Sequence, residues 1–137
     1  MAFETFEHGA DIGIRGIGKT LEQAFEEGAK AMFSLMVEDL SQVVPKDTIE
    51  IQCDAMDLEM LFVAYLNSLL AESDINNFIF SSFQVEIQDL NLKSKAMGEP
   101  FDPKRHVPGV GVKGATLTAL AVEQKDGYWV AQCIVDV

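Results

Sequence analysis

Tyr128-Trp-Val-Ala-Gln-Cys-Ile-Val-Asp136-Val137 has the alternation and the apolar content of a buried β-strand that ends at a carboxylate. If Val137 is the chain terminus, its main-chain carboxylate lies one residue from the Asp136 side chain. Two carboxylates that share a site shift each other's pKa strongly unless a cation or a basic group lies between them. The stretch therefore predicts a positively charged group at this end of the strand. The alternative interpretation is that Asp136 is an ordinary solvated terminal residue.

Length and composition predict a single domain, residues 1–137, with a sizeable core. Hydrophobic residues make up 48% of the chain, which favours a globular protein over a disordered one. No apolar run reaches the roughly 18 residues of a membrane span, and the first residues lack the pattern of a signal peptide. Cys53 and Cys133 lie among apolar neighbours without a zinc-binding spacing, which indicates reduced core residues of a cytoplasmic protein.

The formal net charge of −12 argues against a free-standing nucleic-acid binder, because phosphate contacts need clustered Lys and Arg. Residues 20–74 carry twelve acidic and two basic side chains, for which solubility is the preferred explanation. Residues 93–113 carry five of the ten basic side chains: Lys93, Lys95, Lys104, Arg105 and Lys113. This asymmetry predicts an oriented encounter between the basic segment and a partner.

Two amphipathic helices are predicted in the first half of the chain. Thr20-Leu-Glu-Gln23 has the pattern of a capping box, and apolar residues recur at helical spacing from there to Met36. A second helix is predicted after Asp54 or Asp57. Its apolar stripe from Leu58 to Leu70 is typical of a helix packed on a sheet.

Alternating segments predict the strands, at residues 3–8, 12–14, 48–53, 79–90, 92–97, 112–122 and 128–137. Between them, residues 98–111 hold three of the four prolines and are predicted to be a functional or mobile loop. The sum is an α+β fold: one antiparallel or mixed sheet with both helices packed on one face.

Four groups of residues carry a family resemblance: His8-Gly-Ala-Asp11-Ile-Gly13, Gly98-Glu99 with Arg105-His106, Lys113-Gly-Ala-Thr116, and Asp136-Val137. In this order, and along essentially the whole chain, they resemble the archease family, which activates the RNA ligase that joins tRNA halves. The resemblance implies a protein that is not itself an enzyme. It implies that the protein promotes guanylylation of the tRNA-splicing ligase at each turnover, and that RNA is contacted only through that ligase.

The resemblance also implies a divalent-cation site at the positions of Asp11, Asp136 and the terminal carboxylate of Val137. Three carboxylates without a Cys form an all-oxygen site, which suits Ca²⁺, Mg²⁺ or Mn²⁺. His8 is either a softer ligand or support for this site, or a hydrogen-bonded residue at a strand end. The last interpretation is preferred.

The family pattern places a functional Lys at Lys113, which is either a counter-charge to the carboxylates or a phosphate contact on the partner. Arg105 and His106 are either part of the partner surface or anchors of the loop, and for His106 the anchor is preferred. The sequence departs from the family at Gly9, where Thr is usual, and at Leu117 and Thr118, where Tyr and His are usual. The ligand positions are unchanged, so metal binding is little affected. The missing Tyr and His affect the surface contacts of the predicted strand at residues 112–122.

Two other functions compete with the accessory role. The first is a small metal-dependent hydrolase that uses Asp11 and Asp136, with His8 or Lys113 for acid–base chemistry. The absence of a Ser/His or Cys/His nucleophile pattern counts against it. The second is a structural or chaperone-like module whose acidic helices bind basic partners.

Overall fold

The computed structural model of the protein describes residues 2–137, which form two α-helices and eight strands. The helices are α1 (Leu21–Met36) and α2 (Leu58–Asn76), and a short 3₁₀ helix, η1 (Leu40–Gln42), follows α1. Two strands lie in the first part of the chain, β1 (Ala2–His8) and β2 (Asp11–Gly18). Three lie in its last part, β6 (Gly114–Ala115), β7 (Ala121–Lys125) and β8 (Tyr128–Asp136). The others are β3 (Asp47–Asp54), β4 (Phe78–Gln88) and β5 (Asn91–Pro100). Neither helix in this part of the chain is long and apolar enough to cross a membrane.

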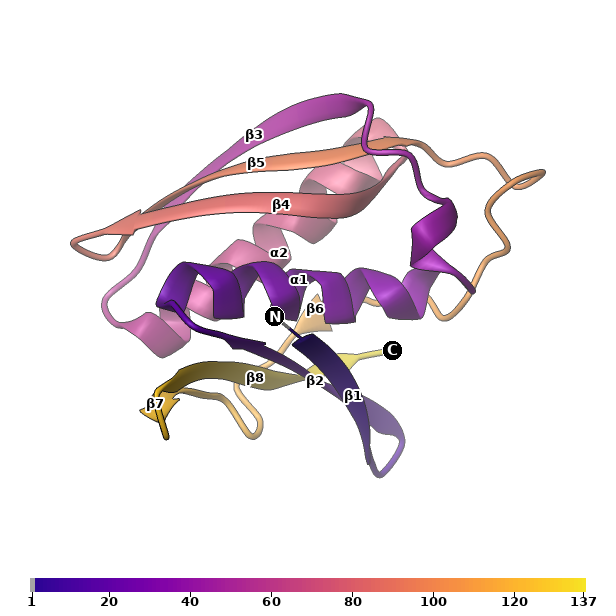
Figure 1. The fold of residues 1–137 in the computed structure, drawn as a ribbon. Coiled ribbons are helices and arrows are strands. Elements are labelled where there is room, and N and C mark those ends of the chain that lie inside the picture. Colours follow the sequence, from indigo (N-terminus) through magenta and orange to yellow (C-terminus); the bar gives the residue numbers. More distant parts are fainter. Residues whose placement is uncertain (1) are drawn as a thin grey trace.

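The strands form two antiparallel sheets with the helices between them (Figure 1). The terminal sheet has the order β1-β2-β8-β6, and β7 also pairs with β8. The middle sheet has the order β3-β5-β4. The α+β class predicted from the sequence is confirmed, and each sheet uses one face to contact the helices. The prediction of a single sheet is wrong.

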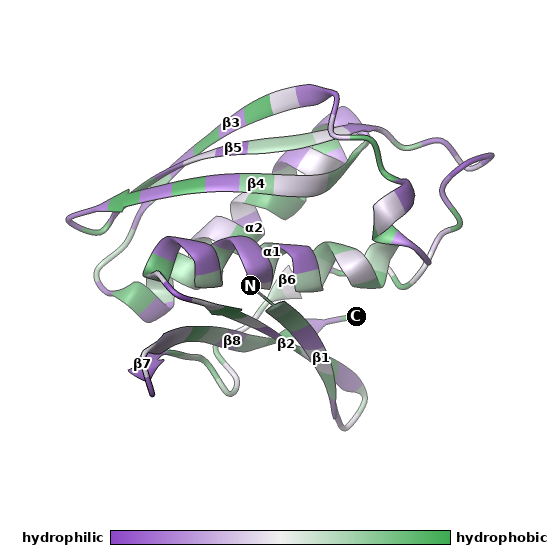
Figure 2. Ribbon diagram, viewed as in Figure 1, coloured by the Kyte–Doolittle hydropathy of each residue, from purple (hydrophilic) through white to green (hydrophobic). Residues whose placement is uncertain are grey.

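The composition of α2 explains why two sheets are needed. Its buried apolar side chains occupy more than one stripe: Leu61, Phe62, Val63, Tyr65, Leu66 and Leu69. A helix that is apolar on most sides has to be covered on most sides. The middle sheet covers α2 on one side, and β6, β7 and β8 of the terminal sheet contact it on another. Hydrophobic and hydrophilic residues alternate along the strands of the middle sheet, as expected for one buried and one solvated face (Figure 2).

Both helices begin at side-chain caps that the sequence predicted. Thr20 Oγ1 accepts a hydrogen bond from Gln23 N at 3.1 Å, and Gln23 Oε1 accepts one from Lys19 N at 2.8 Å. These bonds satisfy main-chain donors that the first turn leaves free. Of the two caps proposed for α2, Asp57 is the one used, because its Oδ1 accepts a hydrogen bond from Met60 N at 2.8 Å.

The predicted strand over residues 112–122 is interrupted. Only Gly114–Ala115 and Ala121–Lys125 pair with β8, and residues 116–120 form a corner between them. Thr116 N still donates to Ile134 O at 3.0 Å, but Ala119 has a φ of +52°, outside the strand region. A residue with left-handed backbone angles interrupts the hydrogen bonding between two strands. The alternation of apolar residues in the sequence does not indicate where such a residue lies.

Helix α1 packs directly on the backbone of β2. A Cβ added to Gly16 would lie 2.1 Å from Ala24 O and 2.2 Å from Gly28 N. On the next layer, Phe25 of α1 contacts Phe62 of α2, with ring centroids 5.0 Å apart. The glycine therefore sets the distance between α1 and the terminal sheet.

Replacing Gly16 by Ala is expected to lower the free energy of unfolding by about 1–3 kcal/mol, because the helix has to move away from β2. Urea unfolding monitored by circular dichroism measures the change. Gly111→Ala is the matched control, since nothing lies within 4 Å of a Cβ added there. The close approach is not a constraint if both variants unfold at the wild-type urea concentration.

Candidate metal and partner site

One end of the terminal sheet collects acidic and basic residues from three strands, beside the start of a fourth. His8 on β1 is the register partner of Asp11 on β2. The pairing of β2 with β8 places Ile12 opposite Val135, and one step further the same register places Asp11 beside Asp136. On its other side, Asp136 pairs with Gly114 of β6. These residues, His8, Asp11, Asp136 and Gly114, are called the sheet-end row below.

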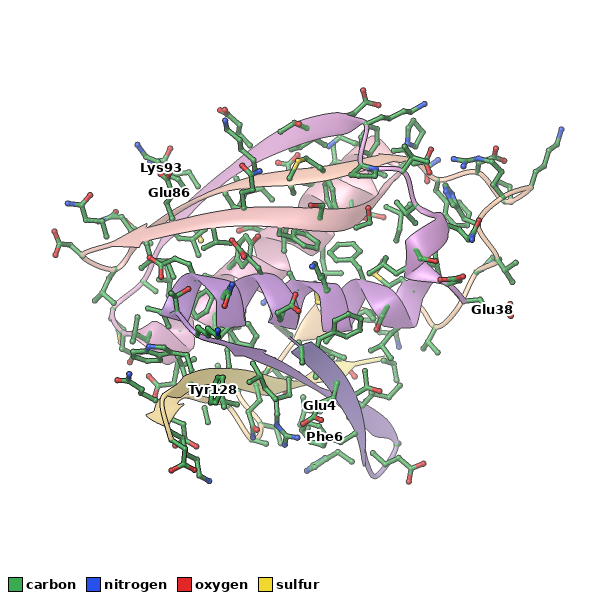
Figure 3. All side chains as sticks on the ribbon, in the orientation of Figure 1. Glu4, Phe6, Glu38, Glu86, Lys93 and Tyr128 are labelled. Carbon is green, nitrogen blue, oxygen red and sulfur yellow. The ribbon has the colours of Figure 1, made fainter. Side chains whose placement is uncertain are left out.

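In the sheet-end row, the side chains of His8, Asp11 and Asp136 lie on the face of the sheet that points away from the helices. Successive residues of a strand point to opposite faces, and Val135, which precedes Asp136, is fully buried in the core. Asp136 and His8 are exposed, and Asp11 is half-buried. On β1, Glu4 and Phe6 share this outer face with His8 (Figure 3). Neighbouring strands lie about 4.7–4.9 Å apart, so Asp11 and Asp136 occupy adjacent positions on this face.

Lys113 lies next to the sheet-end row through its main chain. Its N–H donates to Asp136 O at 2.7 Å. The Lys113 side chain is exposed, and within residues 2–137 it makes no ion pair. Val137 follows β8 and packs partly against the core. The fold thus brings together four of the seven predicted site residues, His8, Asp11, Asp136 and Lys113, and places Val137 directly after them.

The row contains two carboxylate side chains rather than a complete ligand set. No group of three or more His, Cys, Asp or Glu side chains in the described residues is close enough to hold a metal ion. Carboxylate oxygens are hard ligands that suit Ca²⁺ or Mg²⁺, which need six or more oxygens in all. Any cation at Asp11 and Asp136 therefore also needs main-chain or solvent oxygens.

A second cluster of charged residues, the Glu99 cluster, consists of Glu99, Arg105 and His106. Glu99 and His106 are 2% and 1% exposed. One Glu99 oxygen accepts hydrogen bonds from Val44 N at 2.7 Å and from His106 Nε2 at 2.9 Å. The Arg105 guanidinium pairs with the other oxygen. The cluster therefore connects the chain after η1 to the chain after β5.

The hydrogen bonds define the protonation of the cluster. His106 Nδ1 accepts a hydrogen bond from Asp102 N at 2.9 Å, so the proton of a neutral ring is on Nε2 and is donated to Glu99. Burial would raise the pKa of Glu99, but the bonds from Val44, His106 and Arg105 hold it below its ordinary value. His106 is thus buried where it holds the loop, and it offers no surface to a partner.

The segment that follows, residues 101–113, is held to the end of α1. Gly109 N donates to Met36 O at 2.9 Å, and Val110 N donates to Leu35 O at 2.7 Å. Helices leave their last carbonyls without intrahelical partners, and these bonds satisfy two of them. A Cβ on Gly109 would lie 2.2 Å from Leu35 O. The only sequence signal for this contact was a glycine inside a Pro-rich segment.

The five basic residues of 93–113 do not form one surface. Lys93 and Lys95 are exposed on β5, and Lys93 points away from the helices beside Glu86 (Figure 3). Lys104 and Arg105 lie in the turn after β5, and Arg105 pairs with Glu99. Lys113 is at the end of the terminal sheet. The five residues therefore lie at separate places, because β5 belongs to the middle sheet and only the 101–113 segment leads from it to the terminal sheet.

Comparison with known proteins finds one family over nearly the whole chain. Residues 3–137 match the Archease protein family. The chain is 42% identical to protein archease of Sulfurisphaera tokodaii and 41% identical to that of Pyrococcus furiosus, and each match covers 98% of both chains. It is also similar to the solution structure of a Methanobacterium thermoautotrophicum protein, with a TM-score of 0.86, 32% identity and 99% coverage of both chains.

A more distant likeness concerns the fold alone. The crystal structure of a Thermotoga maritima archease, described there as a possible chaperone, matches with a TM-score of 0.63 and 17% identity. The match covers 98% of this chain and 96% of the other.

Glu99→Gln should weaken the pH dependence of stability below about pH 4.5, the ordinary pKa of this group. A carboxylate whose pKa is lowered by folding stabilises the protein above its unfolded pKa. This contribution is lost as the pH falls through the folded pKa. Urea unfolding at neutral and at acid pH measures both variants.

At neutral pH the Glu99→Gln variant should be less stable than the wild type, because Arg105 loses its buried anionic partner. Glu123→Gln, at an exposed position on β7, serves as the control and should follow the wild type at each pH. If the free energy of unfolding changed equally with pH in wild type and Glu99→Gln, a lowered pKa of Glu99 in the folded protein would be contradicted.

Proposed function

Because the chain belongs to the archease family, we propose that it is an accessory protein that activates the tRNA-splicing RNA ligase of its cell. In this proposal it acts in the cytoplasm and promotes guanylylation of the ligase, so that the ligase completes many turnovers. RNA is contacted by the ligase and only indirectly by this protein. The ligase, and not this chain, carries out the chemistry.

The observation that carries the proposal is the sheet-end row. Asp11 and Asp136 come from opposite ends of the sequence, yet the β2–β8 register makes them neighbours on an exposed face. We assign them, with the main-chain carboxylate of Val137, as the ligands of a divalent cation, Ca²⁺ or else Mg²⁺ or Mn²⁺. The donor set fits such an ion because it is all oxygen, and because Cys133 points into the core. A bound cation would neutralise these carboxylates and let them approach an anionic partner.

The position of Lys113 favours one of its two possible roles. A counter-charge would form an ion pair with Asp11 or Asp136, and none joins Lys113 to any residue described. Its main chain is nevertheless fixed to Asp136 at 2.7 Å. The main chain of Lys113 is therefore fixed beside Asp136, while its ammonium group has no ion-pair partner among the described residues and remains available. We propose that it contacts an anionic group near the nucleotide or RNA of the ligase.

The proposal is tested by a time course of ligase guanylylation with substoichiometric amounts of this protein. Wild type should sustain many turnovers, and Asp11→Ala should fold normally, bind Ca²⁺ or Mn²⁺ more weakly in calorimetry, and fail to activate. If Asp11 acted only as a turn cap, the variant would lose about 0.5–2 kcal/mol of stability and activate normally. Glu123→Gln again serves as the control for a lost surface charge.

A variant with a glycine added after Val137 isolates the third ligand. The extension converts the carboxylate of Val137 into an amide and should weaken cation binding. Unchanged affinity would remove Val137 from the site. Hydrolysis of phosphate esters by the purified protein, without a ligase, would instead favour the hydrolase hypothesis.

Lys113→Ala should reduce ligase activation while leaving the fold and cation affinity intact, because the side chain forms no ion pair within the described part of the chain that its loss would break. Lys113→Arg keeps the charge but changes the donor geometry, so partial rescue indicates an electrostatic role. Both variants are compared in calorimetry and in the guanylylation assay. Altered cation affinity with normal activation would assign Lys113 to the carboxylates instead.

A further inference from the structure

A groove of about 740 Å³ lies between the second half of α2, the start of β4 and the 101–113 segment. Its apolar lining consists of side chains that pack against the edge of the core and remain partly exposed: Met36, Leu70, Phe78, Phe101 and Val112. Its polar lining includes Asp74 and Lys113. Lys113 lines the groove, and its main chain is hydrogen-bonded to Asp136. The groove is therefore adjacent to the sheet-end row.

At Val112, which lines one wall of the groove, and at the preceding Gly111, the main chain has no partners among the described residues. Val110 N and Lys113 N each donate a hydrogen bond, to Leu35 O and Asp136 O, both at 2.7 Å. Between them, the main chains of Gly111 and Val112 make no hydrogen bond to any residue from 2 to 137. Both ends of this short stretch are fixed while its middle is open. An open main-chain edge can pair with an added strand.

The same edge is closed a few residues later. Asn67 of α2 accepts a hydrogen bond from Ala115 N at 2.9 Å and donates one to Ala115 O at 3.4 Å. Its side-chain amide thus takes the place that a neighbouring strand would occupy. The open main-chain edge at Gly111 and Val112 therefore ends before Ala115, and Val112 places it against the groove.

Charge favours a basic occupant. Asp74 and Lys113 are the charged side chains that line the groove, and neither forms an ion pair with another described residue. Lys113 is assigned above to an anionic group of the ligase. Asp74 is therefore expected to pair with a positively charged group of the occupant. The net charge of −12 also favours a basic partner over an acidic one.

We propose that this groove receives an extended segment of the ligase. The segment pairs with the main chain at Gly111 and Val112, places an apolar side chain on the groove floor, and places a Lys or Arg beside Asp74. The inference rests on the proposed function for the identity of the partner. Docking in this groove would bring Lys113 and the sheet-end row to the same partner surface.

Ala71 offers a way to block the groove without disturbing the core. It lies on the exposed side of α2 and lines the groove. Ala71→Trp should weaken ligase binding about tenfold or more, which corresponds to about 1.4 kcal/mol. The control is Ile75→Trp, one turn further along α2 at a position that is 76% exposed and outside the groove lining. Asp74→Lys should weaken binding as well, and added salt should reduce the difference from wild type.

Hydrogen exchange on the complex separates strand pairing from other kinds of contact. The amides of Gly111 and Val112 should exchange more slowly in the presence of purified ligase. If wild type neither binds nor activates the ligase, the proposed function and this inference both fail. If wild type activates it, and Ala71→Trp activates equally with no slowing at Gly111 and Val112, only the groove assignment is overturned. Loss of ligase binding in Ala71→Trp without slowed exchange in wild type would overturn the strand pairing and indicate a helical segment of the ligase in the groove.

Discussion

The antiparallel pairing of β2 with β8 joins the two ends of the chain, and the candidate site depends on its register. Ile12 faces Val135 and Ile14 faces Cys133, and these four side chains point to the helices. A shift by one residue would turn these side chains to solvent, which the loss of core burial forbids. The core thus fixes the register, and the register makes Asp11 and Asp136 neighbours. The position of Gly16 against α1 holds the same strand at its other end.

The 101–113 segment transmits a second constraint from the middle sheet to this site. The buried Glu99 cluster holds its beginning, and the last carbonyls of α1 hold its centre. At the end of the segment, the main chain of Lys113 is bonded to Asp136. The segment is therefore fixed at its beginning, its centre and its end. A Pro- and Gly-rich stretch is in this way an ordered connection, because each of its contacts satisfies a polar group that the neighbouring elements leave unpaired.

Lys113 connects the sheet-end row to the groove, because its main chain is bonded to Asp136 and the residue lines the groove. Their chemistry differs: carboxylates suited to a cation, an ammonium suited to an anion, and an apolar channel with an open main-chain edge. An accessory protein needs no nucleophile or closed cavity of its own, and it can act by presenting charge at a fixed place. The two proposals describe one encounter, in which the groove supplies affinity and the sheet end supplies the functional groups.

The sequence by itself determined the elements that depend on neighbouring residues. The capping box at Thr20 and the apolar spacing of both helices are local, and so is the alternation of β8; these patterns were enough for the α+β class. The sequence resemblance pointed to Asp11, Asp136 and Lys113, but spacing alone could not show that they meet.

Only the tertiary structure decided the contacts between distant residues. The division into two sheets follows from the need to cover α2 on several sides, and the break at Ala119 follows from a left-handed φ that hydropathy does not encode. The pairing of Glu99 with His106 and Val44 could not be predicted, because a buried hydrogen bond depends on where the chain returns. For the same reason the basic residues of 93–113 were grouped by sequence and separated by the fold, since one strand and one linking segment carry them from one sheet to the other.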